Sequence, residues 1–174
     1  MAGSKQSKEA LNRTLLFIAT LLNDNGVKDW FIAYGTLLGI IRGGSCIDKD
    51  DDVDIVTNKT NYDIIRKILI DNGFVLTNCG NKNKDFIKTV TSDKYSSVDI
   101  YMANVNETTG DFFDKWEKTL WSSCYHENEI PKLEWNGQIL NIPMNAETKL
   151  VNRYGEQWRI PRNVKNGGKT PRKL

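Results

Sequence analysis

The chain has 174 residues, of which 39% are hydrophobic and 26% charged, and its formal net charge is +2. This composition is typical of a globular protein, with room for one domain with a hydrophobic core but not for two ordinary domains. A net charge this small does not by itself indicate a nucleic-acid partner. No apolar run approaches the length of a membrane span, and residues 1–10 lack the apolar core of a signal peptide.

The three cysteines, Cys46, Cys79 and Cys124, are scattered and odd in number. That pattern favours reduced thiols over a disulfide framework or a zinc site. With no targeting segment visible, we expect a cytoplasmic protein. A secretory location would follow only if the sequence is part of a longer chain.

Residues 1–25 are expected to provide an N-terminal helix, over residues 4–25, that packs against the rest of the chain. Its apolar side chains recur at three- and four-residue spacing: Leu11, Leu15, Leu16, Ile18, Ala19 and Leu22. Asn25-Gly26 is a typical helix stop.

Residues 26–161 are expected to form one α/β domain, a small twisted mixed sheet flanked by helices with the site at one edge. The predicted elements in its first part are strand 27–34, helix 36–42, an acidic strand ending at residue 56, helix 60–72, strand 74–76, and a hairpin of strands 86–91 and 97–102. The second part is expected to hold a polar loop at 104–111, a short helix at 114–121, an Asn-Gly hairpin at 133–140 and a helix at 145–154. Residues 162–174 are basic and are predicted to be a disordered tail.

The acidic strand, Asp50-Asp51-Asp52-Val53-Asp54-Ile55-Val56, is the most informative stretch. Side chains alternate along a strand, so Asp52 and Asp54 lie on one face while Val53 and Ile55 point into a core. Two adjacent carboxylates repel each other unless a cation lies between them. Hard oxygen ligands of this kind suit Mg²⁺ or Mn²⁺, which also coordinate substrate phosphates.

A Gly-Thr turn precedes this strand. Gly35 allows a tight turn and a close approach of the backbone to a ligand, and Thr36 offers a hydroxyl and an N–H at a helix start. Arg42 is either a surface residue at a helix end or a phosphate clamp, because the guanidinium group matches phosphate geometry.

Asp99, in Val98-Asp99-Ile100, is flanked by apolar residues and is expected on a buried strand. An unpaired buried carboxylate is costly. Asp99 therefore either pairs with a basic residue such as Lys88 across the hairpin, or is the third carboxylate of the metal site.

Two motifs carry a family resemblance. Tyr-Gly-Thr-Leu-Leu-Gly-x-x-Arg at 34–42, followed by Asp-Asp-Asp-Val-Asp-Ile at 50–55, resembles the LicD/fukutin-related phosphotransferases of the nucleotidyltransferase superfamily. Tyr-Gly-x-x-Trp-x-x-Pro at 154–161 resembles the closing motif of that family. The chain departs from the family at Asp48-Lys49, where Pro-Trp is usual, so the resemblance does not identify the acceptor.

The resemblance implies a catalytic and metal-binding role for Asp52, Asp54 and Asp99, with Mg²⁺ or Mn²⁺ as cofactor. It also implies that the donor phosphates are bound by four residues: Gly35, Thr36, Arg42 and Lys88.

Members of the family are expected to move a phospho-alcohol, such as phosphocholine or phosphoribitol, from a CDP-linked donor to a sugar or glycan, releasing CMP. Two alternatives stay open: transfer of a nucleoside monophosphate from an NTP, and a non-catalytic nucleotide- or glycan-binding domain. Nucleic-acid binding through the basic tail has little other support. The oligomeric state does not follow from the sequence.

Overall fold

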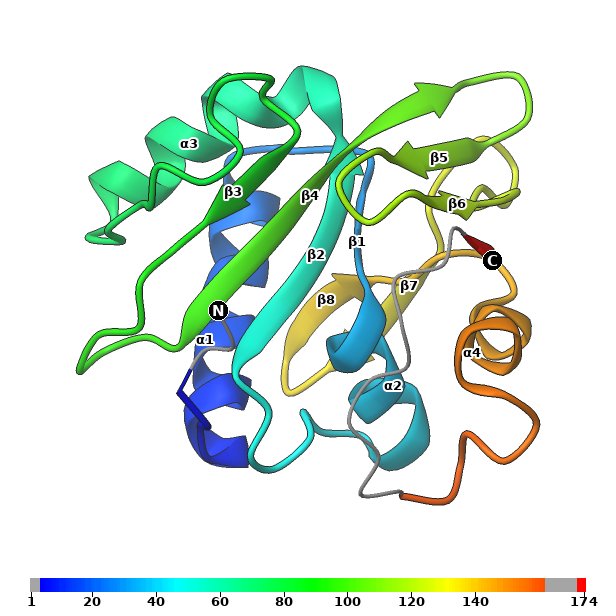
Figure 1. Ribbon diagram of the computed structural model, residues 1–174, viewed down its shortest axis with the longest axis horizontal. Coiled ribbons are helices and arrows are strands. Elements are labelled where there is room, and N and C mark those ends of the chain that lie inside the picture. The colour runs from blue at the N-terminus through cyan, green and yellow to red at the C-terminus, as the bar shows by residue number, and fades with distance from the viewer. Residues whose placement is uncertain (1–3, 162–171) are drawn as a thin grey trace.

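A seven-stranded mixed sheet forms the centre of the structure, a computed structural model that describes residues 4–161 and 172–174 (Figure 1). The strand order is β1-β2-β4-β5-β6-β9, and β3 also pairs with β4. The strands are β1 (Trp30–Ile32), β2 (Asp52–Asn58), β3 (Phe86–Lys88), β4 (Ser97–Asn106), β5 (Asp111–Asp114), β6 (Thr119–Trp121) and β9 (Arg172–Lys173). The predicted α/β architecture is confirmed.

Parallel pairing of β2 with β4 sets the centre of the sheet. Apolar residues alternate with polar ones at the start of both strands, and Val53, Ile55, Val98 and Ile100 are all fully buried. Their burial fixes the register, since a slip by one residue would turn this apolar set to the opposite face. In that register Asp54 is the partner of Asp99.

The apolar face of the sheet is covered by α1 (Lys8–Asp24), which crosses behind β2 and β4 in Figure 1. The hydroxyl of Ser7 caps α1 by accepting from the N–H of Ala10. After the short η1 turn (Lys59–Asn61), α3 (Tyr62–Asp71) leads towards the same layer. There the rings of Phe17, Phe74 and Tyr95 stack on one another, with centroids 4.4–6.1 Å apart.

The helix α2 (Tyr34–Gly43) follows β1 directly and packs against β2 and α4 (Ala146–Tyr154). A separate hairpin of β7 (Lys132–Trp135) and β8 (Gln138–Asn141) lies against α1. The Asn-Gly hairpin is confirmed: Asn136 and Gly137 both have positive φ, as its tight turn requires.

Two predictions between residues 104 and 121 are wrong. Strand β4 continues to Asn106 and β5 begins at Asp111, so half of the expected loop is strand and only residues 107–110 form the turn. The expected helix at 114–121 is instead the turn and second strand of the β5–β6 hairpin. Phe112 and Trp121 are paired across this hairpin and fully buried, so a sheet rather than a helix buries the apolar residues here.

Two further expectations need correction. Residues 74–76 form only a single bridge, between Leu76 and Thr89, instead of a strand. Disorder was expected for residues 162–174; residues 162–171 lie outside the described part, but Arg172–Lys173 form β9 and Leu174 is 2% exposed. The apolar terminal side chain explains the difference, because it has a core to join. No helix in the described part of the chain is long and apolar enough to cross a bilayer.

Candidate active site

Three carboxylates meet where β2 and β4 run side by side. Asp54 and Asp99 are register partners, and Asp52 lies two residues before Asp54 on the same face. One oxygen from each carboxylate lies within 4.8 Å of the others. We call Asp52, Asp54 and Asp99 the carboxylate cluster.

The Gly-Thr turn holds Asp54 in place. Its Oδ2 accepts from the N–H of Gly35 at 3.1 Å, and its own N–H donates to the hydroxyl of Thr36 at 2.8 Å. A Cβ at position 35 would lie 2.7 Å from Oδ2 of Asp50 and 3.4 Å from Oδ2 of Asp54. Only glycine allows the start of α2 to come this close to the carboxylates.

Lys88 bridges two members of the cluster from the neighbouring strand β3. Its Nζ lies 2.6 Å from Oδ1 of Asp99 and 3.7 Å from Oδ2 of Asp52. Both interpretations of Asp99 are therefore compatible with the structure: it pairs with Lys88 across the hairpin, and it is also adjacent to Asp52 and Asp54. One lysine for three carboxylates leaves the cluster with excess negative charge.

Burial and this excess negative charge both affect the pKa values of the three carboxyl groups. Burial raises the pKa of Asp52 to about 10, and repulsion by Asp54 and Asp99 adds to the shift. Burial, followed by repulsion from Asp99 and Asp50, raises the pKa of Asp54 well above its ordinary value. Burial also raises the pKa of Asp99, although Lys88 opposes the shift. Burial acts to lower the pKa of Lys88, but its hydrogen bond to Asp99 and the nearby carboxylates raise it overall.

The donor set fits a hard divalent cation. Carboxylate oxygens this close together are the ligands that Mg²⁺ and Mn²⁺ prefer, and a cation among them would offset the repulsion that now raises their pKa values. Asp50, whose carboxylate faces Gly35 beside Asp54, adds a fourth acidic group to this region.

Arg42 is not brought to the cluster. It lies in the last turn of α2, seven residues or about 10 Å along the helix from Gly35. There its Nη1 donates to the carbonyl of Trp158 at 3.4 Å, so it joins α2 to the closing motif at the one residue of that motif whose side chain is buried. A phosphate-binding role for Arg42 stays a prediction without a contact to support it.

Sequence reasoning missed the aromatic residues around the cluster. The hydroxyl of Tyr101 donates to Oδ1 of Asp54 at 3.3 Å, and its ring packs on that of Tyr34 at 4.8 Å. The hydroxyl of Tyr34 in turn donates to Oδ2 of Asp114 at 2.5 Å, and the guanidinium of Arg153 lies 4.2 Å from the Tyr34 ring. Tyr101 follows Asp99 by two residues, so strand alternation could have placed it on the same face.

Comparison with known proteins identifies the family of the chain and a solved structure with a similar fold. The family model described as LicD/FKTN/FKRP, nucleotidyltransferase domain, matches residues 27–145. No curated protein matches the chain. Among solved structures, the lincomycin-bound crystal structure of the lincosamide antibiotic adenylyltransferase LnuA is similar, with a TM-score of 0.60 at 15% sequence identity. The similarity covers 88% of this chain and 89% of the LnuA chain, and at that identity it shows a shared fold. The family match spans well over half of the sequence and contains the whole carboxylate cluster, so the chain belongs to the LicD/FKTN/FKRP nucleotidyltransferase-domain family.

Proposed function

We propose that this protein is a metal-dependent phosphotransferase that moves a phospho-alcohol from a CDP-linked donor to a hydroxyl of a sugar or glycan, releasing CMP. The observation that carries the proposal is the carboxylate cluster, three carboxylates within 4.8 Å on adjacent strands beside a Gly-Thr turn. Membership of the LicD/FKTN/FKRP family supports the transferase class, and the motif at residues 34–42 supports the CDP-linked donor by resemblance.

In this proposal Asp52, Asp54 and Asp99 hold one or two Mg²⁺ or Mn²⁺ ions. Such ions supply charge neutralisation on the transferred and leaving phosphates. Three hydrogen bonds hold Asp54 in place before substrate binds: its carboxylate accepts from the N–H of Gly35 and the hydroxyl of Tyr101, and its own N–H donates to the hydroxyl of Thr36. Little reorganisation of Asp54 is therefore needed during the reaction.

The reaction is a substitution at phosphorus. The acceptor oxygen forms a bond to the phosphorus that carries the alcohol, the bond from that phosphorus to the bridging oxygen breaks, and CMP leaves with the bridging oxygen. The hydroxyl proton passes to Asp99, the candidate base, and then to solvent. Lys88 lies 2.6 Å from Asp99, and a divalent cation held by the carboxylates would replace its charge there and leave Lys88 free to bind the donor phosphates.

A second candidate is transfer of a nucleoside monophosphate from an NTP to a small molecule or protein. The fold shared with LnuA, an adenylyltransferase, favours it, and it needs the same carboxylates. The two reactions differ in the donor, so donor preference distinguishes them.

The test is thermal unfolding with Mn²⁺ or Mg²⁺ and a panel of CDP-choline, CDP-ribitol, CDP-glycerol, CTP, ATP and UTP. A ligand at about 100 times its dissociation constant stabilises the protein by roughly 2.7 kcal/mol. Metal-dependent stabilisation by one CDP-alcohol, lost in Asp54→Asn, would support the phosphotransferase and name its donor. Asp71→Asn, on the exposed surface of α3, is the matched control and should respond like the wild type.

The other outcomes separate the alternatives. A preference for an NTP would replace the lead proposal with nucleotidyl transfer. Metal-independent binding of a nucleotide or glycan, equal in Asp54→Asn, would indicate a non-catalytic binding domain. No response to any nucleotide would contradict both enzymatic proposals.

A further inference from the structure

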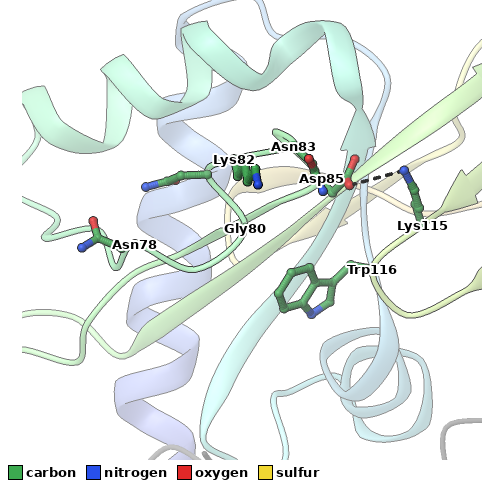
Figure 2. Close-up of a pocket in the computed structure, with 8 residues that line it drawn as sticks. Asn78, Gly80, Lys82, Asn83, Asp85, Lys115 and Trp116 are labelled. Carbon is green, nitrogen blue, oxygen red and sulfur yellow. Dashed lines mark ion pairs between the residues drawn. The ribbon is translucent and has the colours of Figure 1, made fainter.

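A cavity of about 350 Å³ lies beside the exposed indole of Trp116 (Figure 2). Its other walls come from the segment before β3, with Asn78, Asn83 and Asp85, and from Lys115. None of these residues belongs to the sequence motifs at 34–42, 50–55 and 154–161. A volume of this size is within the range of small-ligand sites.

Sheet topology places the cavity on the face of the carboxylate cluster. On β3, Phe86 and Lys88 point to the same side, and their partners on β4 are Tyr101 and Asp99. Trp116 stacks on Phe86 with ring centroids 4.6 Å apart and planes at 12°, so it lies on that side too. Phe86 is two residues from Lys88, about 7 Å along the strand.

The position of Trp116 is fixed by the same network that orders the Gly-Thr turn. Strands β3 and β5 lie end to end along one edge of β4, so the β5–β6 turn leaves the sheet beside the start of β3. Oδ1 of Asp114 accepts from the N–H of Trp116 at 2.9 Å, while Oδ2 accepts from the hydroxyl of Tyr34, the residue before Gly35. The turn that carries Trp116 is thereby tied to the turn beside Asp54.

The chemistry of the cavity suits a nucleobase. Phe86 covers one face of the indole, and Trp116 is still 41% exposed, which is unusual for so large an apolar side chain and leaves the other face accessible. The amides of Asn78 and Asn83 form no side-chain hydrogen bond with any described residue, so each can donate to and accept from a base edge. The side chain of Lys115 is 61% exposed, and its Nζ lies 3.9 Å from Oδ2 of Asp85, so Lys115 contributes positive charge at the rim of the cavity.

We infer that this cavity is the nucleobase subsite of the donor, in which the base stacks on the free face of Trp116 while its phosphates extend towards Lys88 and the carboxylate cluster. The inference rests on the proposed function, since it assumes a nucleotide donor. Stacking on one indole accepts any base, so in this proposal a preference for cytosine comes from the polar groups that line the cavity, with the amides of Asn78 and Asn83 as the candidates.

The test compares two ligands that differ only in the base, CMP and ribose 5-phosphate, by calorimetric titration with saturating Mn²⁺. The wild type should bind CMP more tightly, and Trp116→Ala should weaken CMP roughly 5- to 150-fold while leaving ribose 5-phosphate unchanged. Trp116→Phe, which keeps a stacking surface, should recover most of the CMP affinity and shows that the effect is not misfolding. Phe113→Ala removes an exposed aromatic from neighbouring β5, outside the cavity, and should change neither ligand.

Each result has one meaning. If the wild type binds CMP with Mn²⁺ and Trp116→Ala binds it equally well, the subsite is wrong while the proposed function stands. If both ligands weaken together in Trp116→Ala, Trp116 supports the fold and does not hold the base. If the wild type binds no nucleotide with metal, both the proposed function and the subsite are wrong.

Discussion

Replacing Asp52 with asparagine should stabilise the metal-free protein and abolish its response to metal. The Asp52 side chain is 14% exposed, and its ion-pair partner is Lys88, at 3.7 Å. If ionised, it repels each neighbouring carboxylate within 4.8 Å by roughly 3.5 kcal/mol at an effective dielectric of about 20. If protonated, it costs folding about 1.4 kcal/mol for each pH unit above its ordinary pKa. Either state is unfavourable at neutral pH.

Lys88 offsets part of this cost, so we expect Asp52→Asn to gain about 1–3 kcal/mol at pH 8 without metal, or roughly 2–10 °C in melting temperature. The assay is thermal unfolding in EDTA and in excess Mn²⁺, with Asp71→Asn as the exposed control. Wild type should be stabilised by Mn²⁺ and the variant should not. A variant that is less stable than wild type in EDTA would refute the repulsion argument, because it would mean that Lys88 already neutralises the site.

Three further predictions concern stability. Without metal, the free energy of unfolding should fall as pH rises from about 5 to 9, because the folded carboxylate cluster keeps protons that the unfolded chain releases near pH 4. Excess Mn²⁺ should flatten this dependence on pH. A metal-free protein whose stability rises over this range would contradict the assigned pKa directions. Gly39→Ala should lower the free energy of unfolding, measured by chemical denaturation, by about 1–3 kcal/mol, because the added Cβ would lie 2.6 Å from the carbonyl oxygen of Ser45. Gly43→Ala is the matched control: its Cβ would have no neighbour within 4 Å, so the free energy of unfolding should stay the same or rise by up to about 1 kcal/mol. Tyr34→Phe should lose about 1–3 kcal/mol, because Oδ2 of the buried Asp114 loses the hydroxyl that donates to it while Oδ1 keeps its backbone donors; an unchanged melting temperature would contradict this.

Local pattern was sufficient for the centre of the fold. Alternation along residues 52–56 placed Asp52 and Asp54 on one face and the apolar residues on the other. The parallel pairing of β2 with β4, which alternation does not reveal, brings Asp99 beside them. The helices α1 and α3 followed from apolar periodicity, and α1 also from its Asn25-Gly26 stop.

Residues 114–121 could not be assigned from local pattern. Their aromatic spacing fits a helix as well as a short hairpin, and the choice depends on Phe31, to which both Phe112 and Trp121 pack edge to face. These two contacts join residues that are 81 and 90 positions apart in the sequence. The same applies to Leu174, whose place at the end of β9 depends on the partner strand β6.

In the candidate site, sequence reasoning found the charged residues but not what positions them. Arg42 was assigned to the phosphates by motif, whereas the structure directs it to the carbonyl of Trp158. The stacking of Trp116 on Phe86 depends on β3 and β5 sharing one edge of β4, a topology that no local pattern reveals.

Release of CMP from CDP-linked donors tests the central claim most directly. Purified protein would be incubated with CDP-ribitol or CDP-choline, a glycan acceptor and Mn²⁺, and CMP would be quantified by chromatography. The account predicts CMP formation that stops with EDTA and in Asp99→Asn, while Asp71→Asn behaves as wild type. CMP formation that persists in Asp99→Asn or in EDTA would contradict a metal-dependent reaction at the carboxylate cluster.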